Sequence, residues 1–216
     1  MQFMDYNQNA ENSEDSNINW KRLAEFFFEV GMLRKTPRTG YQFLGSGSES
    51  VAEHSFRTTV IGYSLARLSG ADWTKVVLMC LFHDLKEARI GDFNYVNRMY
   101  NTALEDRALR DSLAETGLEE AIHSAHLELE QTDSFEASLA QDADQLDFIL
   151  NLKEQKDLGN PYGSKWLHYA LKRLRTEFAE QMASRILETD HTDWWFKSAD
   201  DDWWAVRNGS DDRNRE

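Results

Sequence analysis

The sequence predicts an all-α protein, and three features of its residue pattern carry this prediction. Apolar residues recur at helical spacing in one segment after another. Runs of β-branched residues are few, and strict alternation of apolar and polar residues, which marks a half-buried strand, is almost absent. With 216 residues, of which 41% are hydrophobic, the chain is long and apolar enough to bury one sizeable core. We therefore expect a single all-α domain.

The N-terminal part of the chain contains a tail, a helix and a loop. Residues 1–18 are polar and lack periodicity, so we expect a disordered tail there. The folded domain is expected over residues 19–190, and its first helix over 19–33. The apolar face of that helix is formed by Leu23, Phe26, Phe27, Val30 and Leu33. Helix-breaking residues in 34–50 then predict a long loop.

Two helices that belong to the core follow this loop. The first begins at Glu49 or Ser50, and its core-facing stripe consists of His54, Thr58, Ile61, Leu65 and Leu68. The second is expected over 72–89, with Asp72 as its N-cap. Its run VVLMCLF is apolar nearly all round, which is typical of a central, buried helix.

The remaining segments are also predicted to be mostly helical. The expected elements are a loop or short helix over 92–101, peripheral helices over 103–115 and 117–130, and longer helices over 134–157 and 164–188. The C-terminal extension, residues 191–216, holds four of the seven tryptophans. So many large apolar groups are unusual in a solvated tail, so we expect this extension to pack on the body of the protein or on a partner.

The composition limits the class of partner and the compartment. The formal net charge of −14 makes the surface repel nucleic-acid polymers, whereas a small phosphate substrate can still bind in a sheltered site. No apolar stretch approaches the ~20 residues that span a bilayer, and the N-terminus lacks the parts of a signal peptide. The single cysteine, Cys80, is interpreted as a small core residue, in agreement with a reducing compartment. We expect a cytoplasmic homodimer without membrane contact.

A group of histidine and aspartate residues predicts a metal site. His83 and Asp84 end the apolar helix, where two buried polar groups need partners. A divalent cation would satisfy them, and His54 supplies another imidazole from the core-facing stripe of the neighbouring helix. A single core histidine is more often a packing residue than a ligand. Two histidines together with the adjacent aspartate favour the metal.

The fourth ligand should come from a third helix, and the residue pattern leaves its identity open. On the helix expected over 134–157, Asp147 lies nearer the centre of the apolar stripe than Asp144. Asp142 lies off the other flank of that stripe. The apolar pattern by itself does not select Asp144, and Asp147 remains its rival.

Three motifs in this order resemble the H…HD…D signature of the HD superfamily: ESVAEHS, LFHDLKEARIGD and QDADQLDFIL. Together with LRKTPRTGYQ, they are similar to the HD-domain 5′-deoxynucleotidase family over roughly residues 20–175. The resemblance implies an HD-domain helical bundle with one divalent cation, ligated by His54, His83, Asp84 and Asp144. Such a set of nitrogen and oxygen donors suits Mn, Co, Fe or Zn better than Ca.

The resemblance also implies roles for four residues outside this ligand set. Glu87 and Asp92 would share proton transfer and positioning, although spacing alone also allows a surface acid and a turn residue. Arg38 would meet the substrate phosphate through paired donors, although a lone loop arginine is often simply exposed. Tyr41 stands where related sequences tend to carry a tryptophan that crowds the 2′ position of the sugar. We therefore expect weaker selection against ribose.

The implied activity is metal-dependent hydrolysis of nucleoside 5′-monophosphates, with deoxyribonucleotides as expected substrates, to nucleoside and phosphate. One alternative is another HD phosphohydrolase that acts on a triphosphate or an alarmone. Alarmone hydrolases carry a Glu-Asp pair where Ala88 follows Glu87 in this chain. The other alternative is an HD protein that binds nucleotides without turnover. The complete ligand set together with Glu87 argues against it.

Overall fold

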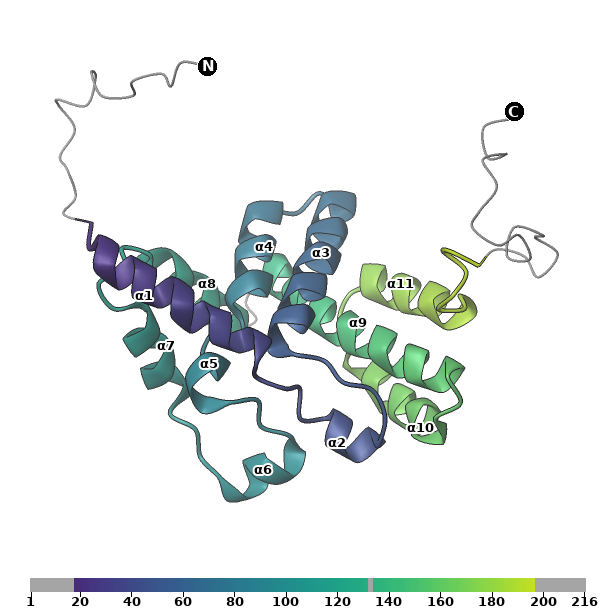
Figure 1. The fold of residues 1–216 in the computed structure, drawn as a ribbon. Coiled ribbons are helices and arrows are strands. Elements are labelled where there is room, and N and C mark those ends of the chain that lie inside the picture. Colours follow the sequence, from purple (N-terminus) through teal and green to yellow (C-terminus); the bar gives the residue numbers. More distant parts are fainter. Residues whose placement is uncertain (1–17, 132–133, 197–216) are drawn as a thin grey trace, which may run out of the picture.

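The computed structural model describes residues 18–131 and 134–196. Most of the expected tail and the second tryptophan pair, Trp203 and Trp204, lie outside the described residues. In the described part every regular element is a helix, so the all-α prediction is confirmed (Figure 1). In chain order these are α1 (Trp20–Val30), η1 (Gly31–Arg34), α2 (Tyr41–Leu44), α3 (Val51–Ser69), α4 (Trp73–Phe82), α5 (Glu87–Ile90), α6 (Tyr95–Tyr100), α7 (Glu105–Leu113), α8 (Glu119–Gln131), α9 (Phe135–Asp157), α10 (Pro161–Ala170), η2 (Leu171–Arg173) and α11 (Glu177–Glu188).

Helices α3, α4 and α9 form the centre of the fold, and α10 and α11 pack on α9 (Figure 1). Small side chains allow the three central helices to approach closely. A Cβ atom added at Gly62 on α3 would lie 2.5 Å from the Sγ atom of Cys80 on α4 and 3.4 Å from the Cβ atom of Ala143 on α9. A larger residue at position 62 would therefore push apart the helices that carry the histidine and aspartate motifs.

A capping box fixes the start of α3. The Ser50 hydroxyl accepts a hydrogen bond from the backbone N–H of Glu53 at 3.2 Å, and the Glu53 carboxylate accepts one from the backbone N–H of Ser50 at 2.7 Å. The predicted helix start is thereby confirmed. His54 follows directly, and its side chain is fully buried.

The helix expected over 72–89 is interrupted, which corrects the prediction. α4 ends at Phe82, and α5 begins at Glu87 after a turn. Within the turn the backbone N–H of Leu85 donates to the carbonyl of Phe82, three residues back instead of the four of an α-helix. The histidine–aspartate pair therefore lies on a tight turn. The glutamate does not continue the face of one unbroken helix.

The helix expected over 164–188 also consists of separate elements. α10 and η2 are followed by an extended residue, and α11 begins at Glu177. The buried carboxylate of Asp142 accepts hydrogen bonds from the backbone N–H groups of Arg175 at 2.8 Å and Thr176 at 2.9 Å. Because a side chain from α9 binds these N–H groups, the helix breaks there and restarts with Thr176 as N-cap.

Two surface features bear on the remaining expectations. Among the described residues, no helix combines the length and apolar character needed to cross a membrane. The structure also describes the first tryptophan pair of the C-terminal extension, in which Trp194 is 81% exposed. The body of the protein therefore does not cover Trp194.

Candidate metal centre and active site

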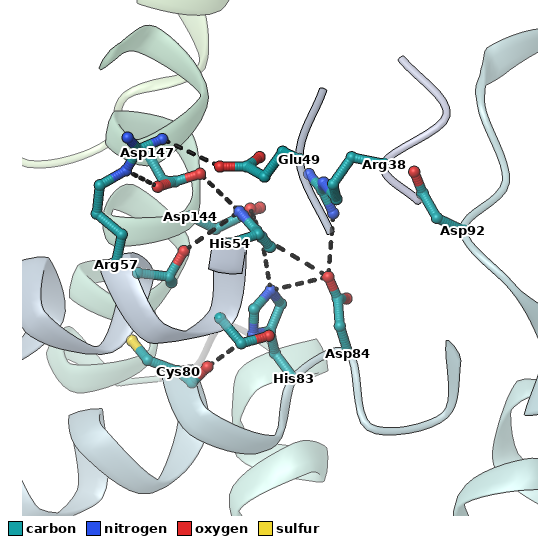
Figure 2. Close-up of polar contacts among 12 residues, drawn as sticks. Arg38, Glu49, His54, Arg57, Cys80, His83, Asp84, Asp92, Asp144 and Asp147 are labelled. Atoms are coloured by element: carbon teal, nitrogen blue, oxygen red, sulfur yellow. Dashed lines mark hydrogen bonds and ion pairs between the residues drawn. The ribbon is translucent and has the colours of Figure 1, made fainter. Parts of the chain in front are cut away.

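Four side chains from three parts of the fold meet at one point (Figure 2). The Nε2 atom of His54 on α3 lies 3.1 Å from the Nε2 atom of His83, which follows α4, and 3.1 Å from the Oδ1 atom of Asp144 on α9. The Oδ2 atom of Asp84 lies 3.1 Å from the His83 Nε2 atom and 3.7 Å from the His54 Nε2 atom. One atom each of His54, His83 and Asp144 lies within 4.8 Å of the others, close enough to share a cation. The structure thus brings together the residues predicted as ligands.

The second nitrogen of each histidine ring is already engaged. The Nδ1 atom of His83 lies 2.8 Å from the carbonyl oxygen of Cys80, and the Nδ1 atom of His54 lies 2.6 Å from the Oδ2 atom of Asp147. Because carbonyl and carboxylate oxygens accept hydrogen bonds, each Nδ1 atom carries the proton in its contact. A neutral imidazole protonated at Nδ1 presents its lone pair at Nε2. The Nε2 lone pairs of His54 and His83 then face the same space, as they do in histidines that bind one metal ion.

This set of donors fits a divalent cation. Two imidazole lone pairs 3.1 Å apart repel each other unless a positive charge lies between them. Burial lowers the pKa of His54, but hydrogen bonds to Asp144 and Asp147 outweigh that effect and raise the pKa to about 10. The carboxylates thus stabilise positive charge at this point. A cation coordinated by nitrogen and oxygen would supply this charge in place of the proton.

Asp147, the rival for the fourth ligand position, lies on the other side of the His54 ring. It contacts the Nδ1 atom, whereas Asp144 faces the Nε2 atom (Figure 2). Glu49, His54 and Asp147 also form a group with metal-like spacing. However, the guanidinium of Arg57 already donates hydrogen bonds to both carboxylates of that group. A side-chain cation takes the place of a metal there, so the geometry favours Asp144 as the ligand.

One cavity borders the ligand group and extends to an aromatic wall. It is lined by the predicted site residues Arg38, Tyr41, Asp84, Glu87, Asp92 and Asp144. Farther along, Phe148 on α9 and Trp166 on α10 line it as a tilted pair of rings with centroids 6.2 Å apart. Neither aromatic residue was among the site residues predicted from the sequence. Phe148 follows Asp144 by one helical turn, which is the signal that could have revealed it.

Glu87 is a buried acid that lines this cavity. Its residue surface is 5% exposed, and its Oε2 atom has no hydrogen-bond partner in the described part of the chain. Burial and the carboxylates of Asp84 and Asp92 raise the pKa of Glu87 to about 9 when no cation is bound. The interpretation of Glu87 as a solvated surface acid is therefore wrong. A buried polar atom without a partner indicates a group that the protein binds.

Contacts with α1 hold the short helix α5 that carries Glu87. Arg89 donates two hydrogen bonds to the Glu29 carboxylate, at 2.5 and 3.0 Å. Leu85, just before α5, is buried in an apolar cluster with Phe26 of α1. These contacts fix Glu87 at the cavity wall.

Arg38 reaches the ligand group from the loop before α2. Its Nη1 atom donates to the Oδ2 atom of Asp84 at 3.1 Å (Figure 2). Burial lowers the pKa of this guanidinium, but the charges of Asp84 and Asp144 outweigh that effect and raise it. Arg38 therefore stays positively charged. Its guanidinium lies beside the residues that would hold a cation, and the two positive charges together would attract an anion into the cavity.

Asp92 anchors the loop that carries Arg38. Its Oδ2 atom accepts hydrogen bonds from the backbone N–H of Thr39 at 2.6 Å and from the Thr39 hydroxyl at 3.2 Å. Because Arg38 directly precedes Thr39, these bonds fix the backbone from which the guanidinium extends. The geometry favours a positioning role for Asp92 over proton transfer.

The raised pKa values predict how the stability of the metal-free protein depends on pH. Folded His54 keeps its proton up to a pKa of about 10, whereas the unfolded chain releases it near 6.5. This stabilisation is fully present below pH 6.5 and is lost as the pH rises toward 10. The pKa of Glu87 is likewise raised, from 4.5 in the unfolded chain to about 9 in the folded protein, so its ionisation also lowers the stability as the pH rises. We expect Tm to fall by roughly several degrees between about pH 7 and pH 9.

Calorimetry of chelator-treated protein checks this prediction. Protein saturated with a divalent cation is the control, and its Tm should fall less because the cation replaces the proton on His54. A Tm of the metal-free protein that stays constant or rises over this window would contradict the prediction.

The chain is similar to known proteins over most of its length. A family model described as "HD domain" matches residues 30–186. A 5′-deoxynucleotidase HDDC2 from Bos taurus is 28% identical over 149 residues, which are 66% of this chain and 72% of that protein. A 5′-deoxynucleotidase HDDC2 from Dictyostelium discoideum is 32% identical over 145 residues, which are 60% of this chain and 75% of that protein. The solved structure of a conserved hypothetical protein from Pyrococcus furiosus is similar with a TM-score of 0.66 and 26% identity, over 77% of this chain and 99% of that one.

Proposed function

The chain belongs to the HD-domain family, and on this premise we propose that it is a metal-dependent phosphohydrolase that cleaves nucleoside 5′-monophosphates, with deoxyribonucleotides preferred, to nucleoside and phosphate. The relatives named 5′-deoxynucleotidase support this substrate class. The observation that carries the proposal is one cavity lined by Asp84 and Asp144 of the histidine–aspartate group, by the charged Arg38 and by Glu87, whose buried Oε2 atom has no hydrogen-bond partner among the described residues.

We assign one task in hydrolysis to each group. When bound, a divalent cation would polarise the phosphoryl group and make water more acidic. Arg38 binds a phosphate oxygen and neutralises the charge that develops on it. Glu87 holds the proton that moves between the attacking water and the leaving 5′ oxygen, because its Oε2 atom is buried and has no hydrogen-bond partner in the part of the chain that the structure describes. Asp92 keeps Arg38 in position through Thr39.

The nucleoside would extend from the phosphate toward the aromatic wall. Tyr41, Phe148 and Trp166 line the same cavity as Arg38. Aromatic rings offer a stacking surface to any base because every base has a π-face. This arrangement suits a nucleotide better than a small phosphate ester.

The proposal is tested by phosphate release from a panel of nucleotides in the presence of single divalent cations. Metal-free protein receives Mn²⁺, Co²⁺, Fe²⁺, Zn²⁺ or Ca²⁺, with ribo- and deoxyribonucleoside 5′-monophosphates, 3′-monophosphates, triphosphates and an alarmone as substrates. We expect release from 5′-monophosphates, and less of it with Ca²⁺ than with the other cations. Preferred hydrolysis of a triphosphate or alarmone would replace this proposal with another HD phosphohydrolase activity. Binding without release would identify a nucleotide sensor.

The Tyr41→Trp variant should discriminate more strongly against ribonucleotides than the wild type. A larger ring beside the sugar fills the space that the 2′ hydroxyl needs, and the ratio of kcat/KM values should shift toward deoxyribonucleotides by roughly 10-fold or more. Paired deoxyribo- and ribonucleoside monophosphates measure this ratio.

The Tyr41→Phe variant is the matched control because it removes only the hydroxyl, which can donate to a 2′ oxygen. Its kcat/KM for ribonucleotides should fall slightly, with no change for deoxyribonucleotides. An unchanged ratio in Tyr41→Trp would mean that Tyr41 does not lie at the sugar.

A further inference from the structure

The Nδ1 side of His54 contains a hydrogen-bond network, centred on the buried Asp147, that the reaction described above does not use. The Asp147 side chain is completely buried, and its Oδ2 atom lies 2.6 Å from the His54 Nδ1 atom. The Nε atom of Arg57 donates to the other oxygen, Oδ1 (Figure 2). The carboxylate thus lies between a histidine and an arginine, both from α3. Neither contact of Asp147 involves His83, Asp84 or Asp144.

Arg57 is itself held by two further side chains. Its Nη2 atom donates to the Oδ1 atom of Asn151 at 2.5 Å and to the Oε1 atom of Glu49 at 3.2 Å. The Asn151 amide group also donates to the Glu49 Oε2 atom at 2.9 Å and to the Asp147 Oδ2 atom at 3.3 Å. The loop before α3, α3 itself and α9 are thereby joined. A guanidinium with this many fixed acceptors has little freedom to turn away from Asp147.

We propose that Asp147, held by Arg57, is a positioning residue that fixes the tautomer and ring plane of His54 so that its Nε2 lone pair faces the cation. This inference rests on the metal-dependent function proposed above. The carboxylate accepts the Nδ1 proton and thereby keeps Nε2 unprotonated and free to bind. Asp147 acts on the metal through His54 and is not a ligand.

The structure argues against a cation on the Nδ1 side of His54. A metal between Glu49, His54 and Asp147 would have to displace the guanidinium of Arg57 from both carboxylates. Arginine remains charged under all ordinary conditions and provides the needed charge without a metal. Asp144 and His83 lie on the Nε2 side, where no arginine donates to Asp144 in the described part of the chain.

An Asp147→Asn substitution should reverse the tautomer of His54. Arg57 can only donate hydrogen bonds, so the amide oxygen of the new side chain would face Arg57. The amide NH₂ group would then face His54 and donate to Nδ1, which moves the ring proton to Nε2. A metal can then bind Nε2 only after this proton has moved back to Nδ1 or has left the ring, which weakens binding. We expect the affinity for Co²⁺ or Zn²⁺ to fall by roughly 10- to 100-fold, while saturating metal still fills one site per chain.

The test combines calorimetric titration with Co²⁺ or Zn²⁺ and ¹⁵N NMR of the histidine rings. Asp142→Asn is the matched control, because Asp142 is an equally buried aspartate on α9 whose contacts serve the start of α11. This control should lower Tm and leave the metal affinity and the His54 tautomer unchanged. Equal metal affinity in Asp147→Asn and the wild type would overturn the proposal, as would complete loss of binding capacity at saturating metal.

A measurement on the wild-type protein keeps the proposal testable if Asp147→Asn does not fold. With Zn²⁺ bound, the ¹⁵N shifts of His54 should show the proton at Nδ1 and the metal at Nε2, and the opposite assignment would overturn the proposal. These readouts do not depend on turnover. Metal binding with the expected tautomer but without phosphate release would refute the proposed hydrolase function and leave the role of Asp147 intact.

Discussion

Replacing Asp84 by Ala, or Asp144 by Asn, is expected to leave the purified protein without its cation and without phosphohydrolase activity. Each carboxylate lies 3.1 Å from a histidine Nε2 atom, so its loss removes one of the donors that stabilise positive charge there. The loss in metal affinity should exceed the roughly 100-fold that follows removal of a ligand's hydrogen-bond partner. Elemental analysis after dialysis against metal-free buffer measures the metal content per chain.

Two other aspartates on α9 serve as controls for this experiment. Asp142→Asn should leave the metal content unchanged, since Asp142 accepts hydrogen bonds at the start of α11. Asp147→Asn should weaken the affinity and still bind one equivalent at saturating metal. Full occupancy in both ligand variants would refute the assigned ligand set. An empty site in Asp147→Asn alone would identify Asp147 as the ligand in place of Asp144.

The Glu87→Ala variant should keep its cation and its affinity for nucleotide but lose most of its turnover. Glu87 lines the cavity, and its buried Oε2 atom has no hydrogen-bond partner among the described residues. Burial and the adjacent carboxylates favour its protonated form. Removing a group that transfers a proton lowers kcat by roughly 10²-fold or more. Steady-state kinetics together with metal analysis separate this effect from loss of the metal.

Two variants separate the proton-transfer role of Glu87 from its effects on shape and charge. Glu87→Gln keeps the size of the side chain but cannot hold a transferable proton, so its kcat should fall as far as that of Glu87→Ala. Glu105→Gln removes an exposed acid that pairs with Lys86 at 2.7 Å, next to Glu87 in the chain, and should leave kcat unchanged. An unchanged kcat in Glu87→Ala would contradict any role in proton transfer.

The helices that the sequence predicted correctly are those whose pattern is local. Repeated apolar residues placed α1, α3 and α9 close to their observed bounds, because the helical period is visible within a single segment. The two predicted helices that proved wrong are interrupted at positions that the apolar repeat does not mark. The break before α11 follows from the Asp142 side chain of α9, more than 30 residues earlier in the chain.

The sequence by itself determined the all-α class and the order of the histidine and aspartate motifs that bring the chain into the HD-domain family. It could not decide between Asp144 and Asp147 as neighbours of the His54 Nε2 atom, because periodicity shows which helix face is buried but not which atoms it meets. The tertiary structure brings Asp147 into contact with the Nδ1 atom of His54, 93 residues away in the chain, and with Arg57, 90 residues away. It also buried Glu87 beside Asp84 and Asp92. Their roles differ because folding gave each carboxylate different hydrogen-bond partners and a different exposure to water.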